Sequence, residues 1–124
     1  MTPLHHIALG ARNVEKMARF YGEVFELIEV DRHFDEDGRL RSVWLDMEGP
    51  ILMIERSEER RQKVDGVGAG PFLLAMSIAP EERDEFEQRL EDWGSVVEER
   101  TDYTSYARDP EGHRVAVSHY PVVG

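Results

Sequence analysis

Two residues in the first half of the chain, His6 and Glu55, have side chains that could do chemistry at a binding site. Glu55 follows Ile51 and Met53 at alternate positions, so on a strand its carboxylate shares a face with apolar side chains. A carboxylate in such surroundings must be hydrogen-bonded or paired. An arginine such as Arg41, or a water molecule, would give it a structural role, whereas the functional interpretation is a general base.

His6 is open to two interpretations. On a strand it shares a face with Ala8, while the adjacent His5 points to the opposite side. An imidazole in this position serves either as a ligand or as a structural hydrogen-bonding group. The sequence is compatible with either role of His6.

The elements that must position these residues occur twice in the same order. Alternating apolar residues indicate strands, and apolar residues at helical spacing after Asn13 and after Pro80 indicate two helices. The predicted strands cover residues 4–10, 27–33, 39–47 and 51–56, and then 72–78, 96–100, 105–108 and 113–119. The sequence therefore predicts an α+β fold of two βαβββ modules, which pack together and form a pocket between them.

Two turns and one glycine-rich segment divide the chain further. Asp35–Gly38 and Asp109–Gly112 have the Asp and Gly residues that tight turns favour. Gly66-Val-Gly-Ala-Gly70 lacks the lysine of a phosphate-binding loop, so it is interpreted as part of a hinge. We expect one domain over residues 1–124, with module one at 4–57, a hinge at 58–71 and module two at 72–120.

Composition excludes several classes of function. The net charge of −11 opposes binding to nucleic acid, and the chain has no cysteine for a disulfide or a thiolate nucleophile. No apolar run is long enough to span a membrane, and the first residues have no signal-peptide pattern. The expected location is cytoplasmic.

Three segments, in this order, resemble the vicinal oxygen chelate superfamily. They are Leu4-His-His-Ile-Ala-Leu, Phe20-Tyr-Gly-Glu-Val-Phe-Glu-Leu and Tyr106-Ala-Arg-Asp-Pro-Glu-Gly-His-Arg-Val. This superfamily includes glyoxalase I, extradiol dioxygenases and bleomycin-resistance proteins. The resemblance implies paired βαβββ modules whose mixed sheets curl around a cavity, and a homodimer.

The resemblance also implies where a metal would be bound. Metal-dependent members place a ligand on the first and last strand of each module, which corresponds to His6 and Glu55 in module one. In module two the aligned residues are Leu73 and Ala116, neither of which is a ligand. The implied cofactor is a divalent ion of zinc, nickel or iron, but half of its site is missing. His119 would reach the site only if a bulge rotated it inward.

These observations favour a small-molecule-binding protein of the glyoxalase/bleomycin-resistance type without a complete native metal site. The alternative is a metal-dependent lyase, isomerase or dioxygenase that uses His6 and Glu55, with Glu55 as the catalytic residue. The expected partners are a small-molecule ligand and a second copy of the chain. The ligand cavity is expected to be lined by His6, Met53, Leu73, Tyr106 and Ala116.

Overall fold

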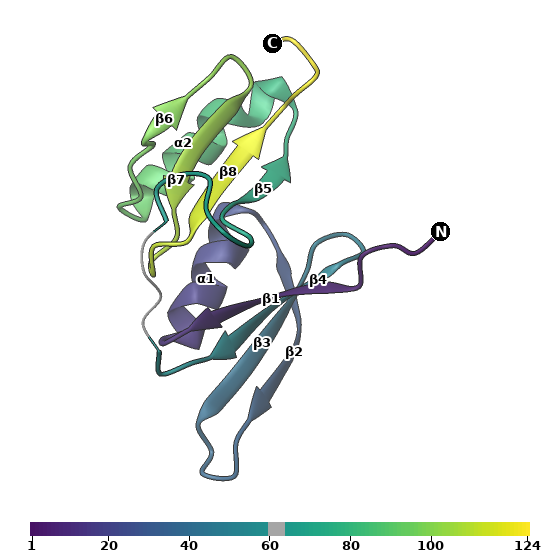
Figure 1. Cartoon of the computed structure of the whole chain (residues 1–124), viewed down its shortest axis with the longest axis vertical. Helices are drawn as coiled ribbons and strands as arrows, with labels where there is room; N and C mark the ends of the chain where they lie inside the picture. The colour runs from purple at the N-terminus through teal and green to yellow at the C-terminus, as the bar shows by residue number, and fades with distance from the viewer. Residues whose placement is uncertain (60–63) are drawn as a thin grey trace. The chain divides into compact units, whose positions relative to one another are not determined.

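A computed structural model describes residues 1–59 and 64–124, and the chain divides into two compact units, Met1–Arg61 and Gln62–Gly124. Each unit contains a strand, a helical segment and three more strands, as the sequence predicts (Figure 1). The elements of unit 1 are β1 (His6–Ala11), α1 (Val14–Val24), β2 (Ile28–Phe34), β3 (Leu40–Asp46) and β4 (Ile51–Arg56). Those of unit 2 are β5 (Leu74–Ser77), the short 3-10 helix η1 (Pro80–Glu82), α2 (Arg83–Asp92), β6 (Glu99–Arg100), β7 (Thr104–Arg108) and β8 (Arg114–Ser118).

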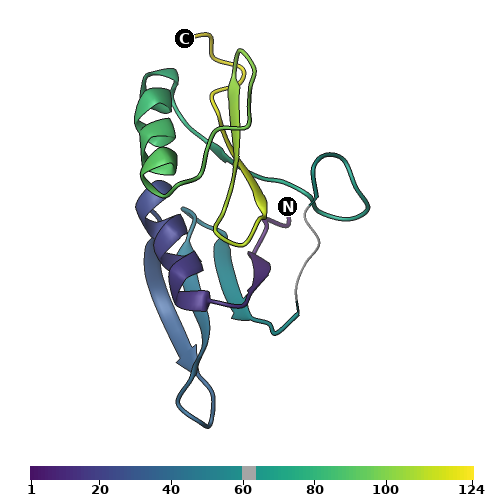
Figure 2. The same ribbon diagram turned by 90° about the vertical axis from the view of Figure 1, so that its left-hand side faces the viewer.

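The two units have the same sheet topology. The strand order is β1-β4-β3-β2 in unit 1 and β5-β8-β7-β6 in unit 2. In each sheet the first pair is parallel and the other two pairs are antiparallel. Figure 2 shows one α-helix beside each sheet. These mixed four-stranded sheets confirm the predicted α+β class with two βαβββ modules.

The helix of unit 1 is held by apolar packing. It is capped by Asn13, whose side-chain oxygen accepts a hydrogen bond from the Lys16 N–H at 3.0 Å. It packs on β3 and β4, which turn Val43, Leu45 and Leu52 toward it. Burial of this seam removes apolar surface from water and is the main force that fixes the helix on the sheet. The buried residues of α1 are Val14, Met17, Ala18, Phe20, Tyr21 and Val24.

The helix of unit 2 depends more on polar contacts. Only Phe86 and Leu90 are buried among its residues. The guanidinium of Arg83, whose side chain is 12% exposed, instead joins the helix to the loop and strand below it. It donates hydrogen bonds to the carbonyl oxygens of Thr101, Asp102 and Thr104 and to the hydroxyl of Ser105, at 2.8 to 3.0 Å.

The predicted turns are confirmed. The Gly38 N–H donates to the Asp35 carbonyl at 3.0 Å, and the Gly112 N–H donates to the Asp109 carbonyl at the same distance. The two glycines have φ of 80° and 90°, a left-handed conformation that a residue with a Cβ adopts only with strain. Glycine at the end of each turn is therefore required by the backbone.

The starts of two predicted elements differ from the structure by three residues, whereas the ends of the other predicted strands differ by no more than two. The strand predicted at 96–100 is reduced to Glu99–Arg100, and Val96, at the start of the predicted strand, is 73% exposed. The helix predicted to begin at Pro80 starts with the 3-10 turn η1, and α2 begins only at Arg83. Both differences occur at ends of elements, where periodicity gives the weakest signal.

Part of the predicted hinge lies outside the described residues, namely 60–63. The residues that follow are bound within unit 2. The Arg108 guanidinium donates to the Val64 carbonyl at 2.6 Å and to the Asp65 carboxylate at 3.0 Å. In the part of the chain that the structure describes, no helix combines the length and the apolar character needed to cross a membrane.

Candidate functional site

The side of the first sheet that faces away from α1 has the chemistry that the sequence singled out. Because side chains alternate along a strand, Ser42 and Trp44 of β3 and Met53 and Glu55 of β4 lie on this side. The strand register places Glu55 opposite Ser42, and Met53 opposite Trp44. We call this set of four residues the open face of unit 1.

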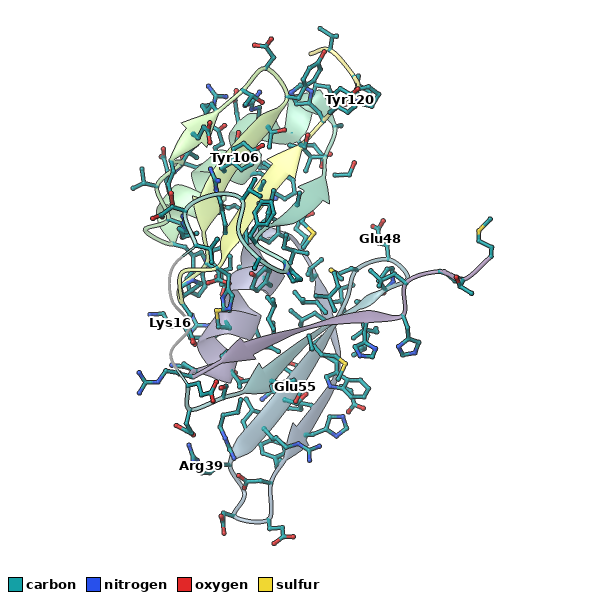
Figure 3. All side chains as sticks on the ribbon, in the orientation of Figure 1. Lys16, Arg39, Glu48, Glu55, Tyr106 and Tyr120 are labelled. Atoms are coloured by element: carbon teal, nitrogen blue, oxygen red, sulfur yellow. The ribbon has the colours of Figure 1, made fainter. Side chains whose placement is uncertain are left out.

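Glu55 lies half-buried on the open face, at the position labelled in Figure 3. Its carboxylate accepts a hydrogen bond from the Ser42 hydroxyl at 3.3 Å, whereas the arginine suggested by the sequence, Arg41, is exposed. A hydroxyl bound to a carboxylate is ordinarily about 2.5–2.7 Å away. The Ser42 bond is therefore weak, and the carboxylate retains capacity for a stronger partner.

Trp44 contributes a buried donor to the same face. Its indole Nε1 is inaccessible to solvent and has no hydrogen-bond partner among the described residues. A buried N–H without a partner costs about 1–3 kcal/mol, so such a group is uncommon unless something outside the chain accepts its hydrogen bond. The Trp44 N–H and the half-buried Glu55 carboxylate lie on the same face. The N–H requires a hydrogen-bond acceptor, and the carboxylate requires a hydrogen-bond donor.

His33 is a residue of this region that sequence reasoning missed. It lies near the end of β2, within the strand predicted at 27–33, and the register pairs it with Ser42. Its ring lies 4.8 Å from the Trp44 ring, between centroids. His33 Nε2 is 3.2 Å from an Asp31 carboxylate oxygen without hydrogen-bond geometry. Trp44 is therefore the buried donor that we consider for a ligand on this face.

His6 does not join Glu55. In the parallel β1–β4 pair, Glu55 lies opposite Gly10, which is four residues beyond His6. At roughly 3.3 Å per residue this places the two residues about 13 Å apart along the sheet, and strand side chains stand nearly perpendicular to it. The His6 ring is exposed, with its Nδ1 2.9 Å from the Nδ1 of His5.

This separation decides whether His6 and Glu55 fit the metal that the resemblance implies. Nitrogen and oxygen ligands lie about 2.0–2.2 Å from zinc, so two ligands of one ion must be close neighbours. His6 and Glu55 of unit 1 do not meet this requirement and do not fit a shared ion. The described residues contain no group of three or more His, Asp or Glu side chains that could hold a metal.

Unit 2 presents different residues on the corresponding side of its sheet. Tyr106 lies opposite Ala116, which in turn lies opposite Ala75. Ala116 is 1% exposed, and Leu73, just before β5, is 37% exposed. The Arg114 guanidinium stacks on the Tyr106 ring at 4.5 Å from its centroid.

The register also corrects the correspondence between the modules. If Leu73 matches His6, then Ala75 matches Ala8 and its partner Ala116 takes the place of Met53. The position of Glu55 is then occupied by Ser118, and not by Ala116 as the sequence alignment suggested. An alignment of β1 with β5 along the sequence does not show which residues of β4 and β8 lie opposite them in the sheets.

His119 lies on the helix side of unit 2. It is 5% exposed, its Nδ1 is 2.6 Å from the Val122 carbonyl, and its Nε2 is 3.5 Å from the Arg83 guanidinium. These contacts use both ring nitrogens. The bulge that would have turned His119 toward the other side of the sheet does not occur in β8, whose register is regular.

Comparison with known proteins now assigns the family. The family model described as Glyoxalase/Bleomycin resistance protein/Dioxygenase superfamily matches residues 3–117, so the chain belongs to this superfamily. This confirms the resemblance to the vicinal oxygen chelate proteins. No curated protein matches the chain by sequence.

Several solved structures share the fold. One is a mutant of the fosfomycin resistance protein FosX from Listeria monocytogenes, bound to Mn(II) and 1S,2S-dihydroxypropylphosphonic acid. It is 20% identical, with a TM-score of 0.80 over 95% of this chain and 92% of that one. FosX from Mesorhizobium loti is 18% identical, with a TM-score of 0.77 over 95% and 91%. Lactoylglutathione lyase from Agrobacterium tumefaciens is 22% identical, with a TM-score of 0.69 over 97% and 95%. At these identities the likeness shows the fold alone.

Proposed function

We propose that this protein binds a small molecule on the open face of unit 1, in the manner of the glyoxalase/bleomycin-resistance type and without a metal held jointly by His6 and Glu55. The observation that supports this most is that the buried, unpartnered Trp44 N–H and the weakly bonded Glu55 carboxylate belong to the same face of the sheet. Membership of the superfamily is consistent with such a ligand, since the Listeria monocytogenes FosX structure contains a small organic phosphonate.

The chemistry of the open face defines the ligand that would fit. The Glu55 carboxylate favours a cationic or hydrogen-bond-donating group, and the Trp44 N–H requires an acceptor. The side chains of Met53 and Trp44 offer apolar and aromatic surface between these polar groups. The expected ligand is therefore partly planar, with a polar end that carries both a donor and an acceptor. If the ligand is also turned over, Glu55 is the residue positioned to take a proton from it.

A thermal-shift screen tests this proposal. We would compare the wild type with Glu55→Gln, which keeps the shape of the side chain and removes its charge. Glu23→Gln is the matched control, since Glu23 is an exposed carboxylate of the same unit that lies on α1. We expect planar amines and amides that raise the melting temperature of the wild type to raise that of Glu23→Gln equally, and to have little effect on Glu55→Gln.

The opposite pattern would point to a structural role for Glu55. In that case the melting temperature of unliganded Glu55→Gln would fall, and every ligand would still bind it with wild-type affinity. The proposal would then be wrong for this residue. A screen in which no compound stabilised the wild type would contradict the proposed ligand chemistry.

The metal-dependent alternative receives no support from the donor geometry of unit 1, because His6 and Glu55 lie four register positions apart. Three other inferences from the sequence stay predictions: the homodimer, the cytoplasmic location, and a wider cavity that includes Leu73, Tyr106 and Ala116.

A further inference from the structure

A second feature of unit 1 lies at the end of its sheet where α1 begins. The parallel strands β1 and β4 run together, with Ala11 opposite Arg56, so both have their carboxyl ends at this edge (Figure 1). The cap residue Asn13 lies two residues after Ala11, and α1 starts directly after it at Val14. The carboxyl ends of parallel strands beside a helix start are the places where α/β sheets most often bind ligands.

This edge has a shallow, open surface cavity of about 350 Å³. Its lining includes three arginines from three parts of the unit: Arg12 before α1, Arg39 before β3 and Arg56 at the end of β4. Arg39 is labelled in Figure 3 at this end of the sheet. Three guanidinium groups around one cavity contrast with a chain whose net charge is −11. Guanidinium groups attract an anionic ligand, and the carboxylates near them offset part of this positive charge.

The carboxylates near the cavity are already paired with arginines, either outside the cavity or within it. Glu15, which also lines it, is 3.2 Å from the Arg32 guanidinium on β2. Glu58 is 3.7 Å from Arg39 and 3.9 Å from Arg56, but its side chain is 74% exposed and free to move into solvent. An anion could therefore displace Glu58 at little cost, since exposed ion pairs contribute about 1 kcal/mol or less.

Arg56 is the fixed member of the group. Its guanidinium is 2.6 Å from the Asp35 carboxylate and donates to the Leu40 carbonyl at 3.2 Å, and its side chain is 20% exposed. Asp35 is in turn held by hydrogen bonds from the backbone N–H groups of Asp37 and Arg39. The guanidinium is thus oriented before any ligand arrives, which lowers the entropic cost of binding.

We propose that this cavity binds the phosphate group of a small organic phosphate. Phosphate oxygens match the planar, forked donors of arginine, and several guanidinium groups can each meet a different oxygen. Val14 and Leu40 also line the cavity, and its volume falls in the range of sites for organic ligands. Arg56 lies on the opposite side of β4 from Glu55, so this site is separate from the open face.

The test is a titration of ¹⁵N-labelled protein with phenyl phosphate at constant ionic strength, followed by NMR. We expect saturable shifts of the amide signals of Val14, Glu15 and Leu40. Arg39→Ala, which removes an exposed arginine from the cavity, should weaken binding about tenfold, as expected for one charged hydrogen bond. Arg41→Ala, which removes an exposed arginine outside the lining, should leave the affinity unchanged.

Two further probes distinguish the contribution of the phosphate group from that of the organic part of the ligand. Inorganic phosphate should shift the same signals with lower affinity, and phenol should shift none of them. Equal affinity for inorganic phosphate and phenyl phosphate would overturn the organic part of the proposal. Shifts caused by phenol, absence of saturation, or equal weakening by Arg41→Ala would overturn the site itself. None of these results bears on Glu55 or Trp44, so the proposed function is tested independently.

Discussion

The sheets of the two units share one strand order but differ in what covers the side away from the helix. In unit 1 the Ser42–Glu55 pair and the Trp44–Met53 pair leave a carboxylate weakly bonded and an indole donor unpartnered. The matching pairs in unit 2 are Thr104–Ser118, joined by a hydrogen bond of 2.8 Å, and Tyr106–Ala116, whose tyrosine ring is covered by the Arg114 guanidinium.

Ion pairs add to this difference. On the same side of unit 2, Arg108 is 2.7 Å from Glu98 and 3.0 Å from Asp65, and Arg114 is 2.8 Å from Glu99. Most polar groups on this side of the second sheet are therefore satisfied within the unit, and the exception is the buried Arg114 Nε, which has no hydrogen-bond partner among the described residues. A repeated module need not repeat its chemistry: we infer that unit 1 keeps the binding role and that unit 2 is mainly structural.

The largest expected effect is on the free energy of unfolding, when the apolar packing that holds α1 is disrupted. Phe20 is fully buried in the apolar seam of α1. Phe20→Ala should therefore lower the free energy of unfolding by about 3–5 kcal/mol, through lost burial and the cavity that remains. Urea denaturation measures this loss. A loss below about 1 kcal/mol would show that α1 is not held by this seam.

In unit 2 the corresponding test removes the hydrogen bonds that hold α2. Arg83→Met should lower the free energy of unfolding by about 1.5–3 kcal/mol, because three backbone carbonyls and a hydroxyl lose a charged donor. Arg83→Lys, which keeps the charge but not the planar fork, should recover only part of this loss. If the methionine variant were as stable as the wild type, the proposed contrast between an apolar and a polar helix attachment would be wrong.

The repeated order of elements could be predicted from the sequence because apolar periodicity and turn residues act locally. Asn13, the Asp35–Gly38 turn and the Asp109–Gly112 turn all occur as expected. The site was less predictable, because it depends on register between strands that are distant in sequence. The distance between His6 and Glu55 and the pairing of His33 with Ser42 both follow from register.

A smaller effect should appear in the pH dependence of stability. The hydrogen bond from Arg56, with those from backbone N–H groups, lowers the pKa of Asp35. A carboxyl group whose pKa is lower in the folded state stabilises the fold above its ordinary pKa, roughly 4, and this contribution is lost as the pH falls through the folded value. Asp35→Asn should therefore be less stable than the wild type at pH 6, and the difference should shrink as the solution is acidified below pH 4. Thermal melts over this pH range measure it, and a constant difference would contradict the assignment.

Metal binding should show the smallest effect. Because His6 and Glu55 do not converge within unit 1, isothermal titration with zinc, nickel or iron(II) should show weak binding or none. His6→Ala should leave that result unchanged. One tightly held equivalent that disappears in His6→Ala would revive the metal-dependent enzyme.

The most direct test of the central claim uses the two tryptophans of the chain as a matched pair. Trp44 lies on the open face of unit 1, and Trp93 caps the end of α2 in unit 2. Their indole N–H groups give separate NMR signals in ¹⁵N-labelled protein. When a ligand found by the thermal-shift screen is added, the Trp44 signal should move downfield, as the buried donor gains an acceptor, and the Trp93 signal should stay in place. A ligand that shifts Trp93 and leaves Trp44 unchanged would contradict the claim that unit 1 contains the binding site.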